Sequence, residues 1–182
     1  MNDESCNHDL SAARQKVVHG VNVFGWHVMQ VLPGVAYPGW AYPIGLHRSF
    51  RHPEVVIFGL GVDTMGEIIN IVGRAAQSGR QFTDGAVTDE LLTQYSCTLR
   101  AVDPVWREQL LGFATWYYAG GEFPVLQVFW PDRARLYPWQ PGFDAALVSA
   151  QPLLFNADPV AARAQALVSS GGASPGELVA DP

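Results

Sequence analysis

The chain has 182 residues, of which 48% are hydrophobic and 15% charged, enough for one domain with a full core and too few for two ordinary domains. Its net charge is -6, with one lysine against ten arginines, and it has no basic run that would neutralise nucleic-acid phosphates. No apolar run approaches the roughly 20 residues that span a bilayer, and the first residues, MNDESCNHDL, are unlike a signal peptide. We therefore expect a cytosolic protein that binds neither nucleic acid nor membrane.

The two ends of the chain differ in composition from its middle. Residues 1–18 lack apolar periodicity and predict a partly ordered arm, with a helical turn or more beginning near Ser11. Residues 158–182 hold an Ala-rich run followed by Ser, Gly and Pro, and they lack the large apolar side chains that offset the entropy of ordering. We predict a disordered, dispensable tail there and a domain over residues 19–157. Cys6 and Cys97 form no disulfide or metal-binding pattern, and Cys97 is expected to be buried.

Three strand-like runs open the domain. GWHVMQVLP, residues 25–33, alternates between two faces, with His27 and Met29 on the same one. WAYPIGLH, residues 40–47, predicts a second strand or an edge strand, because Pro43 cannot donate a hydrogen bond to a neighbouring strand and belongs at an edge or a bulge. EVVIFGLG, residues 54–61, is nearly all apolar and predicts a strand buried on both faces.

Helices and further strands follow in alternation. Apolar residues at helical spacing predict a helix from Thr64 to Ser78, with Thr64 and Glu67 as a capping box. LLTQYSCTLRAV, residues 91–102, predicts one strand, and a second helix is expected from Asp103 to Gly120. FPVLQVFWPD predicts the last strand, which leads into the irregular PWQPGFD. This order predicts an α+β fold, a mainly antiparallel sheet with two packed helices.

Titratable residues gather in YPIGLHRSFRHPE, residues 42–54. The candidate catalytic residues here are His52, Glu54 and His47, because a histidine beside a carboxylate is suited to acid–base chemistry near neutral pH. A structural turn with a hydrogen bond between a histidine and the carboxylate is the alternative. The H-x4-H-x-E spacing matches no standard metal site, so we predict no metal and no cofactor.

Residues of ligand-binding type occur in this segment, in a second segment over residues 130–139, and at His27. Arginines can hold a phosphate or carboxylate, although a pair of them in a loop is often only solvated. Aromatic residues can line a pocket or pack over the core, and a histidine on an apolar face can be purely structural. The candidate ligand-binding residues are His27, Tyr42, Arg48, Arg51, Trp130, Asp132, Arg133 and Trp139. A shared site requires the two segments to lie within about 10 Å of each other.

Four separated motifs resemble a known family. GWHVMQV, YPIGLHRSFRHPEVVIFGL, IINIV and FPVLQVFWPDRARLYPW are similar, in this order, to motifs of the bacterial family DUF4262, a domain of unknown function. The resemblance covers about residues 19–152 and implies a shared fold without a reaction. At Pro43 the family usually has threonine, so a role of that hydroxyl would be absent here. The motif positions matched are Gly25, Trp26, His27, Tyr42, Gly45, Leu46, His52, Pro53, Glu54, Asn70, Gln127, Trp130, Pro131, Asp132 and Trp139.

Two functions are consistent with these features. The first is the binding of a small polar or anionic molecule between segments 42–54 and 130–139, with acid–base catalysis by histidine and glutamate as an extension. The second is a non-enzymatic interaction protein, such as an immunity or regulatory partner, that buries the aromatic residues of 129–143 against another protein.

Overall fold

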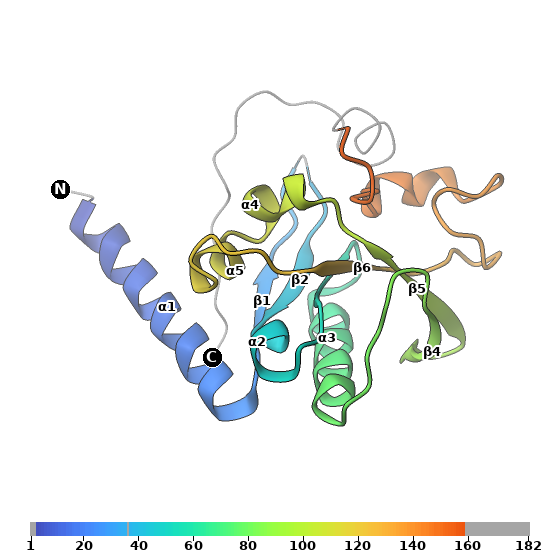
Figure 1. Cartoon of the computed structure of the whole chain (residues 1–182). Coiled ribbons are helices and arrows are strands. Elements are labelled where there is room, and N and C mark those ends of the chain that lie inside the picture. The colour runs from blue at the N-terminus through green and yellow to red at the C-terminus, as the bar shows by residue number, and fades with distance from the viewer. Residues whose placement is uncertain (1–2, 36, 159–182) are drawn as a thin grey trace.

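The computed structural model describes residues 3–35 and 37–158, with the backbone alone for residues 3–9 (Figure 1). Within these residues the chain forms a six-stranded sheet in the order β1-β2-β3-β6-β5-β4. Neighbouring strands are antiparallel except β3 and β6, which are parallel. The predicted α+β fold with a mainly antiparallel sheet is confirmed. The strands are β1 (His27–Val31), β2 (Trp40–Ile44), β3 (Glu54–Phe58), β4 (Val87–Leu92), β5 (Tyr95–Ala101) and β6 (Val125–Phe129).

Helices cover both faces of the sheet, which gives three layers. On one face α3 packs its apolar stripe, including Ile68 and Ile69, against residues of β3, β5 and β6. On the other face α1, η1 and α5 enclose a second core around Tyr42 and Val56. The helical elements are α1 (Asp3–Phe24), α2 (Leu46–Phe50), α3 (Val62–Gln77), α4 (Arg107–Leu110) and α5 (Gly112–Tyr117), with 3-10 turns η1 (Pro104–Trp106) and η2 (Ala145–Ala150).

Because both faces are covered, the central strands are buried throughout. Every residue of β3 and β6 is buried, as the apolar run of β3 predicts.

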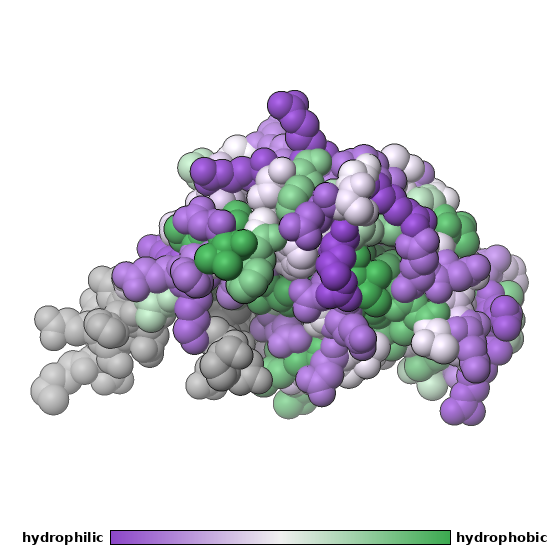
Figure 2. All heavy atoms as spheres, turned by 90° about the horizontal axis from the view of Figure 1, so that it is seen from below, coloured by the Kyte–Doolittle hydropathy of each residue, from purple (hydrophilic) through white to green (hydrophobic). Residues whose placement is uncertain are grey.

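The face seen from below in Figure 1 is mostly hydrophilic, with smaller groups of hydrophobic residues among the polar ones (Figure 2).

The first helix is longer than the sequence predicts. Residues 3–24 form one helix, so the predicted domain boundary at residue 18 falls inside an element. Val17 and Val21 are four residues apart on this helix and are buried in the second core. Two valines in a polar stretch give a weak periodic signal, which explains why the pattern predicts only an arm. The predicted tail lies outside the described residues, except for Asp158.

β2 is the second strand that the sequence predicts, and of the two alternatives for it the edge position is wrong. β2 pairs with β1 along its whole length and with β3 at Trp40 and Ala41. Pro43 pairs with Val28 of β1 and lies beyond the part of β2 that pairs with β3. Proline is therefore tolerated in an interior strand here, because the second ladder ends before it.

Helix α3 lies where the sequence predicts it but begins differently. It starts at Val62 with Gly61 as its N-cap, and no side chain caps it, so the expected capping box of Thr64 and Glu67 does not form. Its end is as predicted, with Ser78 as the C-cap and Gly79 at a φ of 88°.

Two predicted elements are divided in the structure. The strand expected over residues 91–102 covers the last two residues of β4, a turn with Gln94 at a φ of 69°, and β5, which pairs with β4 as a hairpin. The second helix begins as predicted, with the Asp103 carboxylate accepting a hydrogen bond from the Val105 amide, but it is interrupted at Leu111. The periodic pattern continues across the interruption and therefore does not indicate it.

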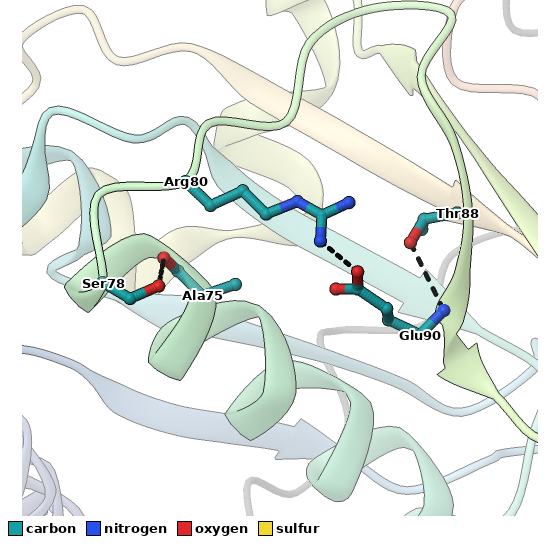
Figure 3. Close-up of polar contacts among 5 residues, drawn as sticks. All are labelled: Ala75, Ser78, Arg80, Thr88 and Glu90. Carbon is teal, nitrogen blue, oxygen red and sulfur yellow. Dashed lines mark hydrogen bonds and ion pairs between the residues drawn. The ribbon is translucent and has the colours of Figure 1, made fainter.

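Polar contacts hold the loop between α3 and β4. The Ser78 hydroxyl donates to the Ala75 carbonyl, and Arg80 forms an ion pair with Glu90 of β4, whose amide donates to the Thr88 hydroxyl (Figure 3).

Across the part of the chain that the structure describes, none of the helices combines the length and the hydropathy needed to cross a membrane.

Candidate functional site

The parallel pair of β3 and β6 brings two distant segments together. Glu54, the first residue of β3, pairs with Val125, the first residue of β6, and the Glu54 amide donates to the Pro124 carbonyl at 2.9 Å. Parallel strands begin at the same end of a sheet. The residues before β3, which include α2, therefore lie beside the residues before β6, which follow α5.

The Glu54 carboxyl group lies at the centre of this end of the sheet and is 1% exposed. Its Oε1 accepts hydrogen bonds from the amides of Gly45 at 2.9 Å and His47 at 3.1 Å, and a further one from the Tyr118 hydroxyl. Its Oε2 is buried and has no hydrogen-bond partner among the described residues. Burial raises the pKa of Glu54 to about 7, although these donors partly oppose the increase.

The backbone at Gly45 makes this arrangement possible. Gly45 has a φ of 116°, a conformation that favours glycine, and it turns the chain from β2 into α2. A methyl group at this position would lie 2.8 Å from the carbonyl oxygen of Gly25 and 2.8 Å from a methyl group of Val21. A glycine is thus needed for the turn whose amides face the carboxyl group.

Two further polar side chains complete an inner cluster, defined here as Glu54, His47 and Tyr118. The His47 ring packs edge-on against the Tyr118 ring, with centroids 6.0 Å apart. His47 Nδ1 is also buried without a hydrogen-bond partner among the described residues. Burial and the neighbouring Glu54 raise the pKa of Tyr118, so its phenol stays protonated and donates to the carboxyl group. The cluster combines a carboxyl group that titrates near neutral pH with an imidazole and a phenol.

Arg48 and Tyr117 form an outer pair; Arg48 follows His47 in the sequence, and Tyr117 precedes Tyr118. The Arg48 guanidinium donates to the Tyr117 hydroxyl at 3.0 Å, and its Cζ lies 5.6 Å from the centroid of the Tyr117 ring. Arg48 is exposed, whereas His47, Tyr117 and Tyr118 are half-buried. The outer pair therefore lies nearer to solvent than Glu54.

His52 lies apart from the inner cluster, and the hydrogen bond expected between this histidine and the carboxylate does not form. Its Nδ1 lies 2.6 Å from the Pro53 carbonyl, which can only accept, and its Nε2 accepts from the Phe82 amide at 3.0 Å. Both nitrogens of the fully buried ring are therefore engaged by backbone, and burial lowers its pKa. His52 packs toward the α3 side, whereas Glu54 faces Tyr118 on the other side.

The other candidates near the first segment have different surroundings. Tyr42 is buried in the core, and burial raises the pKa of its phenol. His27 is half-buried against Gly20 of α1, and burial lowers its pKa. Arg51 is exposed at a φ of 56° and closes α2.

The second segment lies at the opposite end of β3 and β6. Trp130 follows Val125 by five residues, which places it roughly 16 Å along the strand from the level of Glu54. Its indole nitrogen donates to the carbonyl of Phe58, the last residue of β3, at 2.8 Å. The two segments therefore do not share one site.

Side chains of the second segment hold this end of the molecule together. The buried Asp132 carboxylate accepts from the amides of Leu136 and Asp144, which closes the loop between them. Trp139 packs edge-on against Phe129, with centroids 5.0 Å apart. Arg133 is exposed. Trp130 is buried and Trp139 is half-buried.

Sequence reasoning missed Tyr118, whose hydroxyl donates to Glu54, and the role of the Gly45 amide. The available signal is the tyrosine pair at residues 117–118, which lies two residues before the predicted helix end at Gly120. It becomes informative only once β3 and β6 are known to be parallel. Asn70, one of the matched motif positions, accepts a hydrogen bond from the Trp26 indole at 3.1 Å.

Comparisons with known proteins identify a family and no characterised relative. Residues 20–144 match the family described as "Domain of unknown function (DUF4262)". No curated protein and no solved structure matches the chain. Among the residues that the structure describes, no group of three or more His, Cys, Asp or Glu side chains is placed to hold a metal ion.

Proposed function

The chain belongs to the DUF4262 family, whose description names no reaction, and we propose from the geometry that it binds a small polar molecule at the inner cluster and exchanges a proton with it through Glu54. The observation that carries the proposal is the pair of buried atoms without a partner, Glu54 Oε2 and His47 Nδ1. A buried polar atom without a hydrogen bond costs about 1–3 kcal/mol, so two of them in one cluster call for a functional explanation.

The division of roles between the two carboxyl oxygens supports proton exchange. Three donors bind Oε1, and they stabilise the negative charge that remains when the proton leaves. Oε2 has no such donor and is the atom that would carry the proton. In the exchange, the bond between Oε2 and hydrogen breaks as a bond forms between that hydrogen and a basic atom of the ligand, and the reverse step restores the acid.

The pKa of Glu54 fits this role. A general acid or base is most effective when its pKa lies near the working pH, because both protonation states are then populated. With its pKa raised to about 7 by burial, Glu54 meets this condition at neutral pH. Tyr118 and the two amides are positioning groups that act through the carboxyl group.

A titration combined with a ligand screen tests the proposal. We expect the carboxyl carbon of Glu54, followed by NMR, to titrate with a midpoint near 7 rather than near 4.5. Small polar molecules that raise the melting temperature should shift this midpoint and perturb the His47 ring. Glu54→Gln keeps an acceptor for the amides but cannot exchange the proton, so it should abolish these shifts.

Glu67→Gln is the matched control, because Glu67 is an exposed carboxylate on α3. It should leave both the titration and the ligand response unchanged. A Glu54 midpoint near 4.5, or ligand binding that Glu54→Gln and Glu67→Gln leave equally intact, would refute the proposal.

A further inference from the structure

We infer that the molecule bound at the inner cluster carries an anionic group, a carboxylate or a phosphate, and that Arg48 binds this group. The inference rests on the proposed function, because it concerns the ligand of the same site. It adds the charge of the ligand and a recognition residue outside the cluster.

Two pairs of adjacent residues place Arg48 next to the cluster. His47 and Arg48 are neighbours on α2, and Tyr117 and Tyr118 are neighbours at the end of α5. The inner members, His47 and Tyr118, contact each other, and the outer members, Arg48 and Tyr117, do the same. A small molecule that reaches Glu54 past His47 and Tyr118 therefore passes the guanidinium.

The geometry of Arg48 suits anion binding. One of its nitrogens donates to the Tyr117 hydroxyl, and the guanidinium lies near the ring, so the side chain is held by two contacts. A guanidinium has five N–H donors, and the remaining ones can form a fork that matches a carboxylate or phosphate. No carboxylate of the described residues lies within ion-pair distance of Arg48, since the ion pairs found there involve Arg80 and Arg100.

The local charge also favours an anion. α2 contains His47 and Arg48 and no acidic residue, although the whole chain has a net charge of -6. Glu54 is the carboxyl group of the cluster, and because burial raises its pKa to about 7, it carries only part of a negative charge at neutral pH. The positive charge of Arg48 is thus poorly compensated by its immediate surroundings.

Arg51 provides an internal comparison. It lies three residues from Arg48, at the end of α2, and is likewise exposed. No hydrogen bond, ring contact or ion pair of its side chain is found among the described residues, unlike the two contacts that hold Arg48. We therefore assign the recognition of the anion to Arg48 and not to Arg51.

The test is an NMR titration of the full chain with acetate, inorganic phosphate and the neutral analogue acetamide at constant ionic strength. We expect acetate or phosphate to shift the signals of the Arg48 side chain and the His47 ring, whereas acetamide has a weaker effect. Arg48→Gln should weaken binding of the anion by about tenfold or more, since hydrogen bonds to charged groups contribute that much. Arg51→Gln, which changes net charge equally, should leave binding within about twofold of the wild type.

The outcomes separate this inference from the proposed function. Equal binding of acetamide and acetate at Glu54, or equal losses in the two arginine variants, would overturn the inference and leave a polar-ligand site in place. If Glu54 also titrates near 4.5 and none of the probes perturbs the inner cluster, both proposals fail. A response to acetate alone or to phosphate alone supports the inference and decides which anion is recognised.

Discussion

Glu54 combines features that oppose each other energetically. Its carboxyl group is almost fully buried, which penalises the charged form, yet three donors converge on one oxygen, which favours that form. Burial dominates, and the pKa rises from 4.5 to about 7. Since each pKa unit corresponds to 1.36 kcal/mol, ionised Glu54 destabilises the folded state by about 3 kcal/mol relative to its protonated form. A side chain kept at this cost is better explained by chemistry than by stability.

This pKa predicts a specific dependence of stability on pH. Below pH 4.5 the carboxyl group is protonated in both states, and between pH 4.5 and 7 the unfolded chain ionises while the folded chain retains its proton. The Glu54 contribution to the free energy of unfolding should therefore fall across this window and level off above pH 7. Glu54→Gln should remove the fall, as measured by urea unfolding at half-unit steps from pH 4.5 to 8.

Subtracting the free energy of unfolding of Glu54→Gln from that of the wild type at each pH isolates the contribution of Glu54 from those of other titrating groups. The lowered pKa of His52 has the opposite effect, because its contribution is present above its unfolded value of 6.5 and is lost as the pH falls through the folded value. This effect is common to wild type and variant and cancels in the subtraction. A difference that stays constant over the whole range would contradict the raised pKa of Glu54.

The turn into α2 shows which part of the site the sequence can predict. The cluster of titratable residues in 42–54 correctly indicated Glu54 at the start of a buried strand, because the apolar run after it is unambiguous. It could not indicate the pairing of that strand. A parallel partner lies far away in the sequence, so neither the contact of Glu54 with Tyr118 nor the separation of Glu54 from Trp130 follows from local patterns. Likewise, the spacing between His52 and the neighbouring titratable residues does not indicate that the Phe82 amide will donate a hydrogen bond to His52 Nε2.

The same turn predicts that Gly45 is less tolerant of substitution than other glycines with positive φ. Gly45→Ala adds a methyl group 2.8 Å from the Gly25 carbonyl oxygen in a conformation that already disfavours alanine. We expect a loss of about 3 kcal/mol or more in the free energy of unfolding, measured by urea denaturation. Gly79→Ala is the matched control: its φ is 88°, but no atom lies within 4 Å of the added methyl group, so about 1 kcal/mol should be lost. Equal losses would show that crowding at Gly45 is unimportant.

The folded unit extends beyond the region that defines the family. The family match ends at residue 144, yet Leu153 and Leu154 are 3% and 1% exposed. The buried Gln127 of β6 donates to the Pro152 carbonyl at 2.6 Å and accepts from the Leu154 amide at 3.1 Å. Residues 151–156 thus complete the core beside β6, the strand whose first residue pairs with Glu54. The candidate site at one end of β6 depends on a segment that packs along the same strand.

A comparison of two shortened chains tests this dependence. A chain ending after residue 144 loses both buried leucines, each of which contributes about 2–5 kcal/mol, and leaves the Gln127 amide without its partners. That sum is a large part of the about 5–15 kcal/mol by which domains are usually stable, so cooperative thermal unfolding should be lost or shifted far downward. A chain ending after Asp158 retains the segment and is the control. Circular dichroism melts that coincide for the two chains would show that residues 145–158 do not contribute to the core, and a Glu54 titration retained in the shorter chain would show that the site forms without them.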